Sequence, residues 1–350
     1  MKKDVFAVLL AGGKGTRLWP LSTKSVSKSF VRIGRLKPLI VVTMRRLSGA
    51  ISKSNTMLVV DKVQDRLLRT FVKGVPKSNI LVEPFGRSTA SAIGLAAINM
   101  KPDDIMVVMP TDQLIKRGPG FLGVIKRASD HVRKNGDVLM CIGIKPTEAS
   151  SAYGYIKVGD RLTGSVYSIE RFLEKPTRSR AARLIKSGDH LWNAGMFVFK
   201  AGGILNAIKK HAPNLYRQLQ YIRTGEKSID AAYRRLKNIS IDYQIMEKAE
   251  NLCCVKGNFC WHDLGSWVSL EGLQSEYGAE GLGARRDDKG NLCFGSSKLV
   301  DTKDSIIYNG SGETLGVVGM RGVVVVRAER GILVCDKKDA EKVKELVAKL

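Results

Sequence analysis

Short apolar segments alternate with longer amphipathic ones through the first 144 residues, and this alternation constrains the fold more than any other feature of the chain. Strands are predicted over 5–10, 56–60, 80–82, 105–109 and 137–144, and helices over 39–47, 65–72, 88–99 and 121–134. This order predicts an α/β fold with a doubly wound, Rossmann-like sheet that is mixed and mainly parallel. Ligands bind such sheets beyond the carboxyl ends of the strands, so the site is expected there.

The pattern changes twice further along the chain. Shorter alternating segments follow, with strands expected at 166–173 and 191–199 covering the site, and 201–250 has a helical pattern. From about residue 283, short strands separated by turns precede a closing helix over 338–350. We therefore expect a large α/β domain over 1–282 and a small β-rich domain over 283–350.

A glycine-rich loop, Ala11-Gly12-Gly13-Lys14-Gly15-Thr16-Arg17-Leu18, follows the first predicted strand. Glycine lets successive N–H groups turn toward one anion, so the loop can close on polyphosphate oxygens while Arg17 and Lys28 supply charge. The loop is not a GxxxxGK[ST] loop, and Leu18 stands where a dinucleotide-binding loop has Gly or Ala. A glycine turn after a strand is often only a tight turn, but the Thr-Arg and Trp-Pro-Leu that follow favour a phosphate site.

Other candidate segments also lie at strand ends. Asp112 follows the strand over 105–109, and magnesium binds one or two such carboxylates together with substrate phosphates, although a lone Asp there is usually a turn residue. The segment 83–90 opens a helix, with Ser88 or Thr89 as the expected N-cap, and its N-terminus favours anions. A capped helix without function is an equally good interpretation of this segment.

Three weaker motifs occur in the middle of the chain. Residues 152–156 (Ala-Tyr-Gly-Tyr-Ile) suit a sugar ring, 172–176 offer a carboxylate and an ammonium group, and 192–197 offer an amide beside a glycine. The segment 241–248 carries apolar residues at helical spacing, for which core packing is the favoured role. Another isolated carboxylate, Asp263, stands between Trp261 and Trp267.

These motifs together, in this order, resemble those of the sugar-1-phosphate nucleotidylyltransferases, and the Trp-Pro-Leu-Ser form of the first is similar to that of mannose-1-phosphate guanylyltransferases. The resemblance covers nearly the whole chain. It implies transfer of GMP from GTP to mannose-1-phosphate, giving GDP-mannose and pyrophosphate by in-line attack on the α-phosphate. It also implies a Mg²⁺ cofactor shared by Asp112 and Asp263. The tail domain is expected to resemble a short left-handed β-helix without the cupin-like isomerase domain of some bacterial relatives.

The same resemblance assigns the site residues. The catalytic residues are expected to be Arg17, Lys28, Asp112, Lys175 and Asp263. The nucleotide-binding residues are expected to be Leu10, Ala11, Gly12, Gly13, Gly15, Thr16, Arg17, Lys28, Arg87, Ser88, Thr89 and Asp112. The sugar-phosphate-binding residues are expected to be Gly154, Tyr155, Glu174, Lys175, Asn193 and Gly195. The chain departs from the family pattern at Ser27 (usually Pro), Ser29 (Gln), Ser88 (Asn) and Gln113 (His).

Charge and composition leave alternatives open. The net charge of +25 suits anionic substrates, and residues 1–60 hold twelve Lys or Arg against one acid. The alternatives are another nucleotide or hexose phosphate, a catalytically silent nucleotide-sensing paralogue, or a basic nucleic-acid-binding protein. Against the last, no RRM, KH or helix-turn-helix pattern occurs, and a salt series would distinguish it.

Location and assembly are predicted from simpler features. No apolar run approaches the length of a membrane span, and the N-terminus leads directly into a strand, so a cytoplasmic protein with no membrane partner is expected. The six cysteines lack metal-site spacing and are expected to be reduced, mostly buried residues. A homodimer is compatible with the assembly role of such tail domains.

Overall fold

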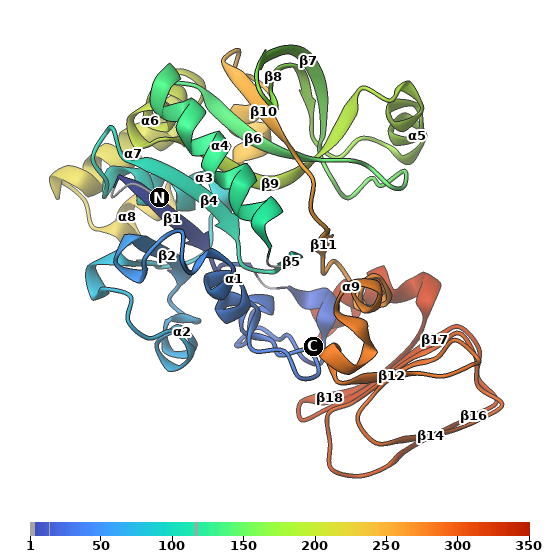
Figure 1. The fold of residues 1–350 in the computed structure, drawn as a ribbon. Coiled ribbons are helices and arrows are strands. Elements are labelled where there is room, and N and C mark those ends of the chain that lie inside the picture. The colour runs from blue at the N-terminus through green and yellow to red at the C-terminus, as the bar shows by residue number, and fades with distance from the viewer. Residues whose placement is uncertain (1–3, 14, 116–117) are drawn as a thin grey trace.

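The computed structural model describes residues 4–13, 15–115 and 118–350. Within these residues a nine-stranded sheet has the order β3-β2-β1-β4-β9-β6-β10-β8-β7 (Figure 1). Its strands are β1 (Val5–Leu10), β2 (Thr56–Asp61), β3 (Ile80–Glu83), β4 (Ile105–Pro110), β6 (Leu139–Ile144), β7 (Tyr155–Thr163), β8 (Val166–Leu173), β9 (His190–Lys200) and β10 (Leu252–Gly257). The sheet is mixed, as expected: β3, β2, β1 and β4 run parallel, whereas β9 is antiparallel to β4, β6 and β7.

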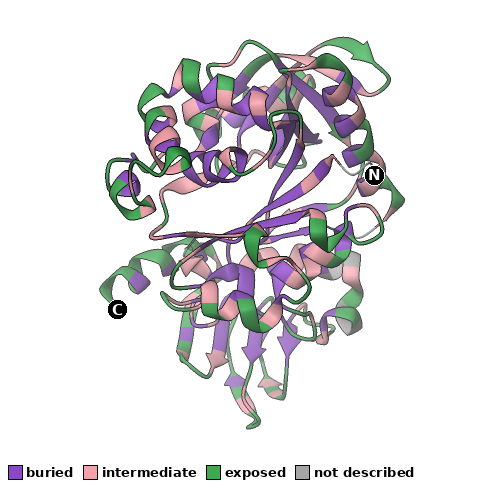
Figure 2. Ribbon diagram, turned by 90° about the vertical axis from the view of Figure 1, so that its left-hand side faces the viewer, coloured by how far each residue is buried: buried purple, intermediate pink, exposed green. Residues whose placement is uncertain are grey.

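Helices cover both faces of this sheet. On one face lie α1 (Leu39–Leu47), α2 (Asp65–Phe71) and α4 (Pro119–Asn135), and on the other lie α3 (Ser88–Ile98), α6 (Ala201–His211), α7 (Pro213–Thr224) and α8 (Ile229–Arg234). Side chains alternate along β1, so Ala7 and Leu9 enter the first core and Val8 enters the second. The buried strands therefore lie between two helical layers (Figure 2).

Several short elements connect or cover these layers. They are η1 (Thr16–Leu18), η2 (Lys28–Phe30), η3 (Lys53–Asn55), η4 (Lys77–Asn79), α5 (Arg178–Ser187), the π-helix η5 (Asp242–Met246) and η6 (Trp267–Ser269). Strand β5 (Gln113–Ile115) pairs antiparallel with β11 (Trp261–Asp263), and α9 (Leu270–Leu282) follows. This two-stranded sheet lies between the main sheet and the C-terminal domain (Figure 1).

The C-terminal domain is a β-helix followed by helical turns. Its elements are β12 (Ala284–Arg286), β13 (Leu292–Phe294), β14 (Ser297–Val300), β15 (Ile306–Asn309), β16 (Leu315–Val318), β17 (Val323–Ala328), β18 (Gly331–Asp336), η7 (Lys337–Lys342) and α10 (Val343–Lys349). Strands β13, β15 and β17 pair in parallel on one side, and β14 pairs in parallel with β16 on another. Its apolar side packs with Leu18 and Trp267 in a third core, so the domain is joined to the glycine-rich loop region.

Candidate active site

The loop after β1 is held in a shape that requires glycine. Gly15 has φ 54°, and a Cβ atom there would lie 2.4 Å from Cβ of Lys28. The Ser22 hydroxyl donates to the carbonyl oxygen of Gly15 at 2.5 Å and closes the turn. Leu10 and Ala11, at the end of β1, lead into this turn, and Lys14 lies outside the described residues. The loop therefore packs directly against Lys28, so both can contact the same phosphate group.

Lys28 lies between the two carboxylates that were predicted to hold a metal ion. Its Nζ is 3.1 Å from Oδ2 of Asp112 and 3.0 Å from Oδ1 of Asp263. The pairing of β5 with β11 sets Gln113 opposite Asp263, and this register brings Asp112 next to Asp263. Burial alone would lower the pKa of Lys28, but the two carboxylates outweigh it and the pKa is raised. The ammonium group therefore stays charged at the centre of the site.

The same carboxylates meet the requirements of a divalent cation. Oδ2 of Asp112 and Oδ1 of Asp263 point to the same position, which Nζ of Lys28 occupies in this structure. Among the described residues, no group of three or more His, Cys, Asp or Glu could hold a metal ion. Two carboxylates completed by water and substrate phosphates form the set that magnesium prefers. The residues present therefore fit Mg²⁺.

Arg17 lies in η1 and contacts the C-terminal domain. Its Nε is 2.9 Å from Oε2 of Glu341 in η7. The same domain also contacts the segment that follows the loop, since Arg330 donates to the Ser25 hydroxyl at 2.8 Å and Gly331 packs on the Trp19 ring. The arginine predicted to bind phosphate is thus paired with a carboxylate that the sequence analysis did not consider.

The predicted sugar-phosphate residues gather around one buried carboxylate. Oε1 of Glu174 is 2.8 Å from Nζ of Lys175, while Oε2 is buried without a hydrogen-bond partner among the described residues. A Cβ atom on Gly154 would lie 2.4 Å from that free oxygen. The Asn193 side chain accepts from the Gly195 N–H at 3.0 Å. These residues form a polar cluster with an unused acceptor, which suits a sugar hydroxyl.

Tyr155 does not present a polar group to this cluster. Its side chain is 1% exposed and belongs to the core on the α4 side of the sheet. Its hydroxyl donates to the Ser150 carbonyl oxygen at 3.0 Å. Side-chain contact between Tyr155 and a sugar is therefore not supported.

Asp242 belongs to the cluster, although core packing was the role favoured for its segment. Asn193 Nδ2 donates to Oδ1 of Asp242 at 2.8 Å. Burial raises the pKa of Asp242, and burial together with Asp242 raises that of Glu174 to about 7. A π-helix such as η5 often marks a functional site. In the sequence, only one feature indicated a functional role for Asp242: a carboxylate stands among apolar residues, and core packing does not explain a carboxylate.

The segment before α3 differs from its expected capping. Arg87 is the N-cap, and neither Ser88 nor Thr89 caps the helix with its side chain. The Thr89 hydroxyl instead accepts from the Ile241 N–H at 2.8 Å, and Ser88 has φ 65°. Arg87 lies over the Phe85 ring and donates to the Tyr233 carbonyl oxygen at 3.1 Å. The polar groups of this segment thus attach it to α8 and to Ile241, the residue before η5.

Glu83, at the end of β3, is a candidate that the sequence analysis missed. It is 4% exposed, and its Oε1 has no hydrogen-bond partner among the described residues. Its Oε2 is 3.9 Å from the position of a Cβ atom on Gly12, so the carboxyl lies beside the glycine-rich loop. Burial raises the pKa of this carboxyl to about 8. The Tyr233 hydroxyl interacts with this carboxyl, and the free Oε1 beside the glycine-rich loop is available to accept from a ligand with hydrogen-bond donors.

Several departures from the family pattern have partners in the structure. The Ser27 N–H donates to Oε1 of Gln64 at 2.9 Å, a bond that proline could not make. Thr111 Oγ1 is 2.7 Å from Ser29 Oγ. Gln113 donates to the Ala194 carbonyl oxygen at 2.8 Å and accepts from the Trp261 indole at 3.0 Å. The altered positions are therefore built into the site's framework.

The fold and these residues define a nucleotidyltransferase, with a glycine-rich loop, a basic side chain and paired carboxylates at strand ends. Residues 6–280 match the nucleotidyl transferase family, and residues 296–350 match the MannoseP isomerase/GMP-like beta-helix domain. The chain therefore belongs to the nucleotidyl transferase family, which confirms the resemblance seen in its motifs.

Relatives extend along the whole chain. A putative mannose-1-phosphate guanylyltransferase of Vibrio cholerae is 32% identical over 366 residues, covering 98% of this chain and 74% of the relative. A mannose-1-phosphate guanylyltransferase of Sinorhizobium fredii is 32% identical, covering 100% of this chain and 68% of the relative. A Thermus thermophilus structure described as a mannose-1-phosphate geranyltransferase has a TM-score of 0.87 and 30% identity, covering 99% of both chains. Among the described residues, every helix is too short or too polar to cross a membrane.

Proposed function

We propose that the protein transfers GMP from GTP to mannose-1-phosphate, forming GDP-mannose and pyrophosphate. The names of its relatives support the sugar and the nucleotide. The observation that carries the choice of guanine is the buried carboxyl of Glu83 beside Gly12, whose Oε1 has no hydrogen-bond partner among the described residues. Guanine presents N1–H and N2–H donors on one edge, and a carboxylate can accept both. Adenine and the pyrimidines of UTP and dTTP present no such pair of donors.

The roles of the site residues follow from charge and position. Gly12, Gly13, Gly15 and Thr16 would offer backbone N–H groups to the triphosphate, and Lys28 would neutralise developing charge on the leaving pyrophosphate. Lys175, paired with Glu174, would neutralise the sugar phosphate. The attacking phosphate oxygen is already ionised at neutral pH, so no general base is required. The protein's contribution is positioning and charge stabilisation.

Asp112 and Asp263 would hold Mg²⁺. The bound ion would supply Lewis-acid stabilisation of the charge that develops on the phosphates. Lys28 then keeps the two carboxylates from repelling each other in the free protein, because its ammonium group contacts both.

Pyrophosphate release tests the proposal. GTP, ATP, UTP and dTTP would each be combined with mannose-1-phosphate and glucose-1-phosphate, with Mg²⁺ and with EDTA. Release confined to GTP with mannose-1-phosphate, and abolished by EDTA, is expected. Release with another pair would change the assigned substrates. No release from a folded protein that binds GTP would indicate a nucleotide-sensing paralogue instead.

A further inference from the structure

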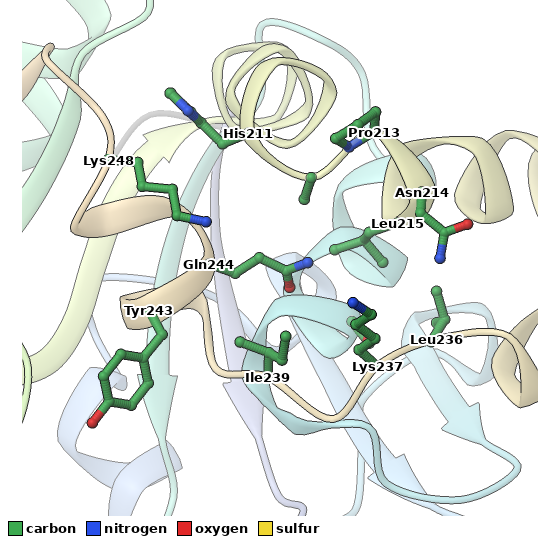
Figure 3. A pocket seen from close by; sticks show the side chains of 12 residues that line it. His211, Pro213, Asn214, Leu215, Leu236, Lys237, Ile239, Tyr243, Gln244 and Lys248 are labelled. Carbon is green, nitrogen blue, oxygen red and sulfur yellow. The ribbon is translucent and has the colours of Figure 1, made fainter.

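A cavity separate from the residues described above opens between α6, α7 and η5 (Figure 3). Its volume is about 400 Å³, which is within the range of small-molecule sites. Its wall includes Leu236, Ile239 and the half-exposed ring of Tyr243, so it is partly apolar. No role in nucleotide transfer has been assigned to these residues.

The charged residues of this cavity are all basic. These are Lys237 and Lys248. His211 also lines the cavity, but burial and the neighbouring Lys210 and Lys248 lower its pKa, so its ring is neutral at pH 7. No carboxylate is among the described lining residues, and Glu250, which acts on His211 from outside the cavity, is paired with Lys210. In Figure 3 the ammonium groups of Lys237 and Lys248 and the amide of Gln244 extend toward the same space. Neither lysine has an ion-pair partner among the described residues. Both lysines are exposed, and a phosphate in contact with both would gain charge-assisted hydrogen bonds from each.

The first turn of α7 adds to this preference. Pro213 is the first residue of α7, and Asn214 follows it at the cavity wall. A helix cannot satisfy its first N–H groups with its own carbonyls, and its N-terminus carries partial positive charge. We propose that this cavity binds a small phosphate monoester, its phosphate on Lys237 and Lys248 and its organic part against Tyr243.

An occupant of this cavity would contact the same helix that serves the sugar-phosphate cluster. Tyr243 and Gln244 line the cavity, while Asp242, the preceding residue, bonds to Asn193. Ile241, one residue earlier, donates to Thr89 at the start of α3. A shift of η5 would therefore reach both substrate segments, so we expect occupancy to change KM for mannose-1-phosphate. This kinetic consequence rests on the proposed function, whereas binding itself does not.

Calorimetric titration tests the site directly. Glucose 6-phosphate and inorganic phosphate would be titrated into the full chain, into the double variant Lys237→Gln/Lys248→Gln, and into a control, Lys186→Gln/Lys349→Gln. The control removes the same charge from two exposed lysines distant in sequence from the cavity. We expect the first variant to lose at least tenfold in affinity for glucose 6-phosphate and the control to lose less than twofold. Tighter binding of glucose 6-phosphate than of inorganic phosphate identifies an ester site.

The outcomes separate the two proposals. Equal affinity for glucose 6-phosphate in the cavity variant and the control overturns the anion site, whatever the enzyme's activity. GTP binding, measured in the same samples, shows whether the nucleotide site is intact in each variant. If the wild type releases no pyrophosphate while the cavity variant still loses affinity for glucose 6-phosphate, only the proposed function is overturned. With activity present, glucose 6-phosphate should change KM for mannose-1-phosphate at least twofold in the wild type and not in the cavity variant.

Discussion

Arg17 Nε lies 2.9 Å from Oε2 of Glu341, so a residue predicted from the sequence to bind triphosphate is paired with the C-terminal domain. Both side chains are substantially exposed, and an exposed pair of this kind is worth at most about 1 kcal/mol. A triphosphate must compete with Glu341 for this guanidinium. The C-terminal domain is thereby placed to tune nucleotide affinity.

Replacing Glu341 by Gln should therefore lower KM for GTP, by up to about fivefold, because about 1 kcal/mol of competing interaction is removed. Steady-state kinetics at saturating mannose-1-phosphate would measure the change. Glu345→Gln, on α10, is the matched control, because it removes the same charge from the same domain. If KM rises instead, Glu341 serves to position Arg17 for the phosphates.

Replacing Asp112 or Asp263 by Asn should lower kcat by two or more orders of magnitude while Kd for GTP without Mg²⁺ changes little. The reason is that metal and carboxylate act mainly where charge develops in the transition state. Rapid-quench turnover and calorimetric binding measure the two quantities. Asp103→Asn, an exposed partner of Lys200, is the control. Full activity in both variants would refute the metal-assisted mechanism.

The parts of this molecule that local patterns determine were predictable from the sequence. The helix 39–47 matches α1 and the strand 166–173 matches β8, because apolar periodicity and flanking breakers act within each segment. The approach of Lys28 to Asp112 and Asp263 depends instead on the pairing of β5 with β11, two short strands about 150 residues apart whose pairing has no local signal.

The site features that the sequence did not indicate depend on tertiary contacts between residues far apart in the chain. The Arg17–Glu341 pair joins two domains. The hydrogen bond from the Ile241 N–H to the Thr89 hydroxyl depends on the position that η5 takes in the fold. Glu83 is recognisable only once its burial and its missing partner are known. These are tertiary properties, so residue type and spacing alone could not indicate them.

Gly154→Ala should impair sugar-phosphate binding without harming the nucleotide site. The added Cβ would lie 2.4 Å from Oε2 of Glu174, so the carboxylate must move. We expect KM for mannose-1-phosphate to rise at least tenfold and Kd for GTP to change less than twofold. Gly316→Ala, where a Cβ meets nothing within 4 Å, controls for the loss of a glycine. An unchanged KM would show that the Glu174 cluster does not bind the sugar phosphate.

The affinity for GTP should depend on pH through Glu83. Its pKa of about 8 means that the free protein holds this carboxyl mostly protonated at pH 7. A neutral carboxyl cannot accept from both guanine donors, so GTP binding requires loss of the proton below pH 8. The association constant should therefore rise up to tenfold per pH unit from pH 6 toward 8 and level off above.

Glu83→Gln separates this effect from ionisation of GTP's own phosphates, which both proteins share. The amide keeps one acceptor but turns an N–H group toward the guanine donors, so affinity for GTP should fall by about 1.5–3 kcal/mol, roughly 10- to 150-fold. The variant should also lose the extra pH dependence, because the titrating group is gone. Calorimetric Kd values from pH 6 to 9 would measure both. Parallel pH profiles with equal affinity would show that Glu83 does not contact the base, and the choice of guanine would then depend on other residues.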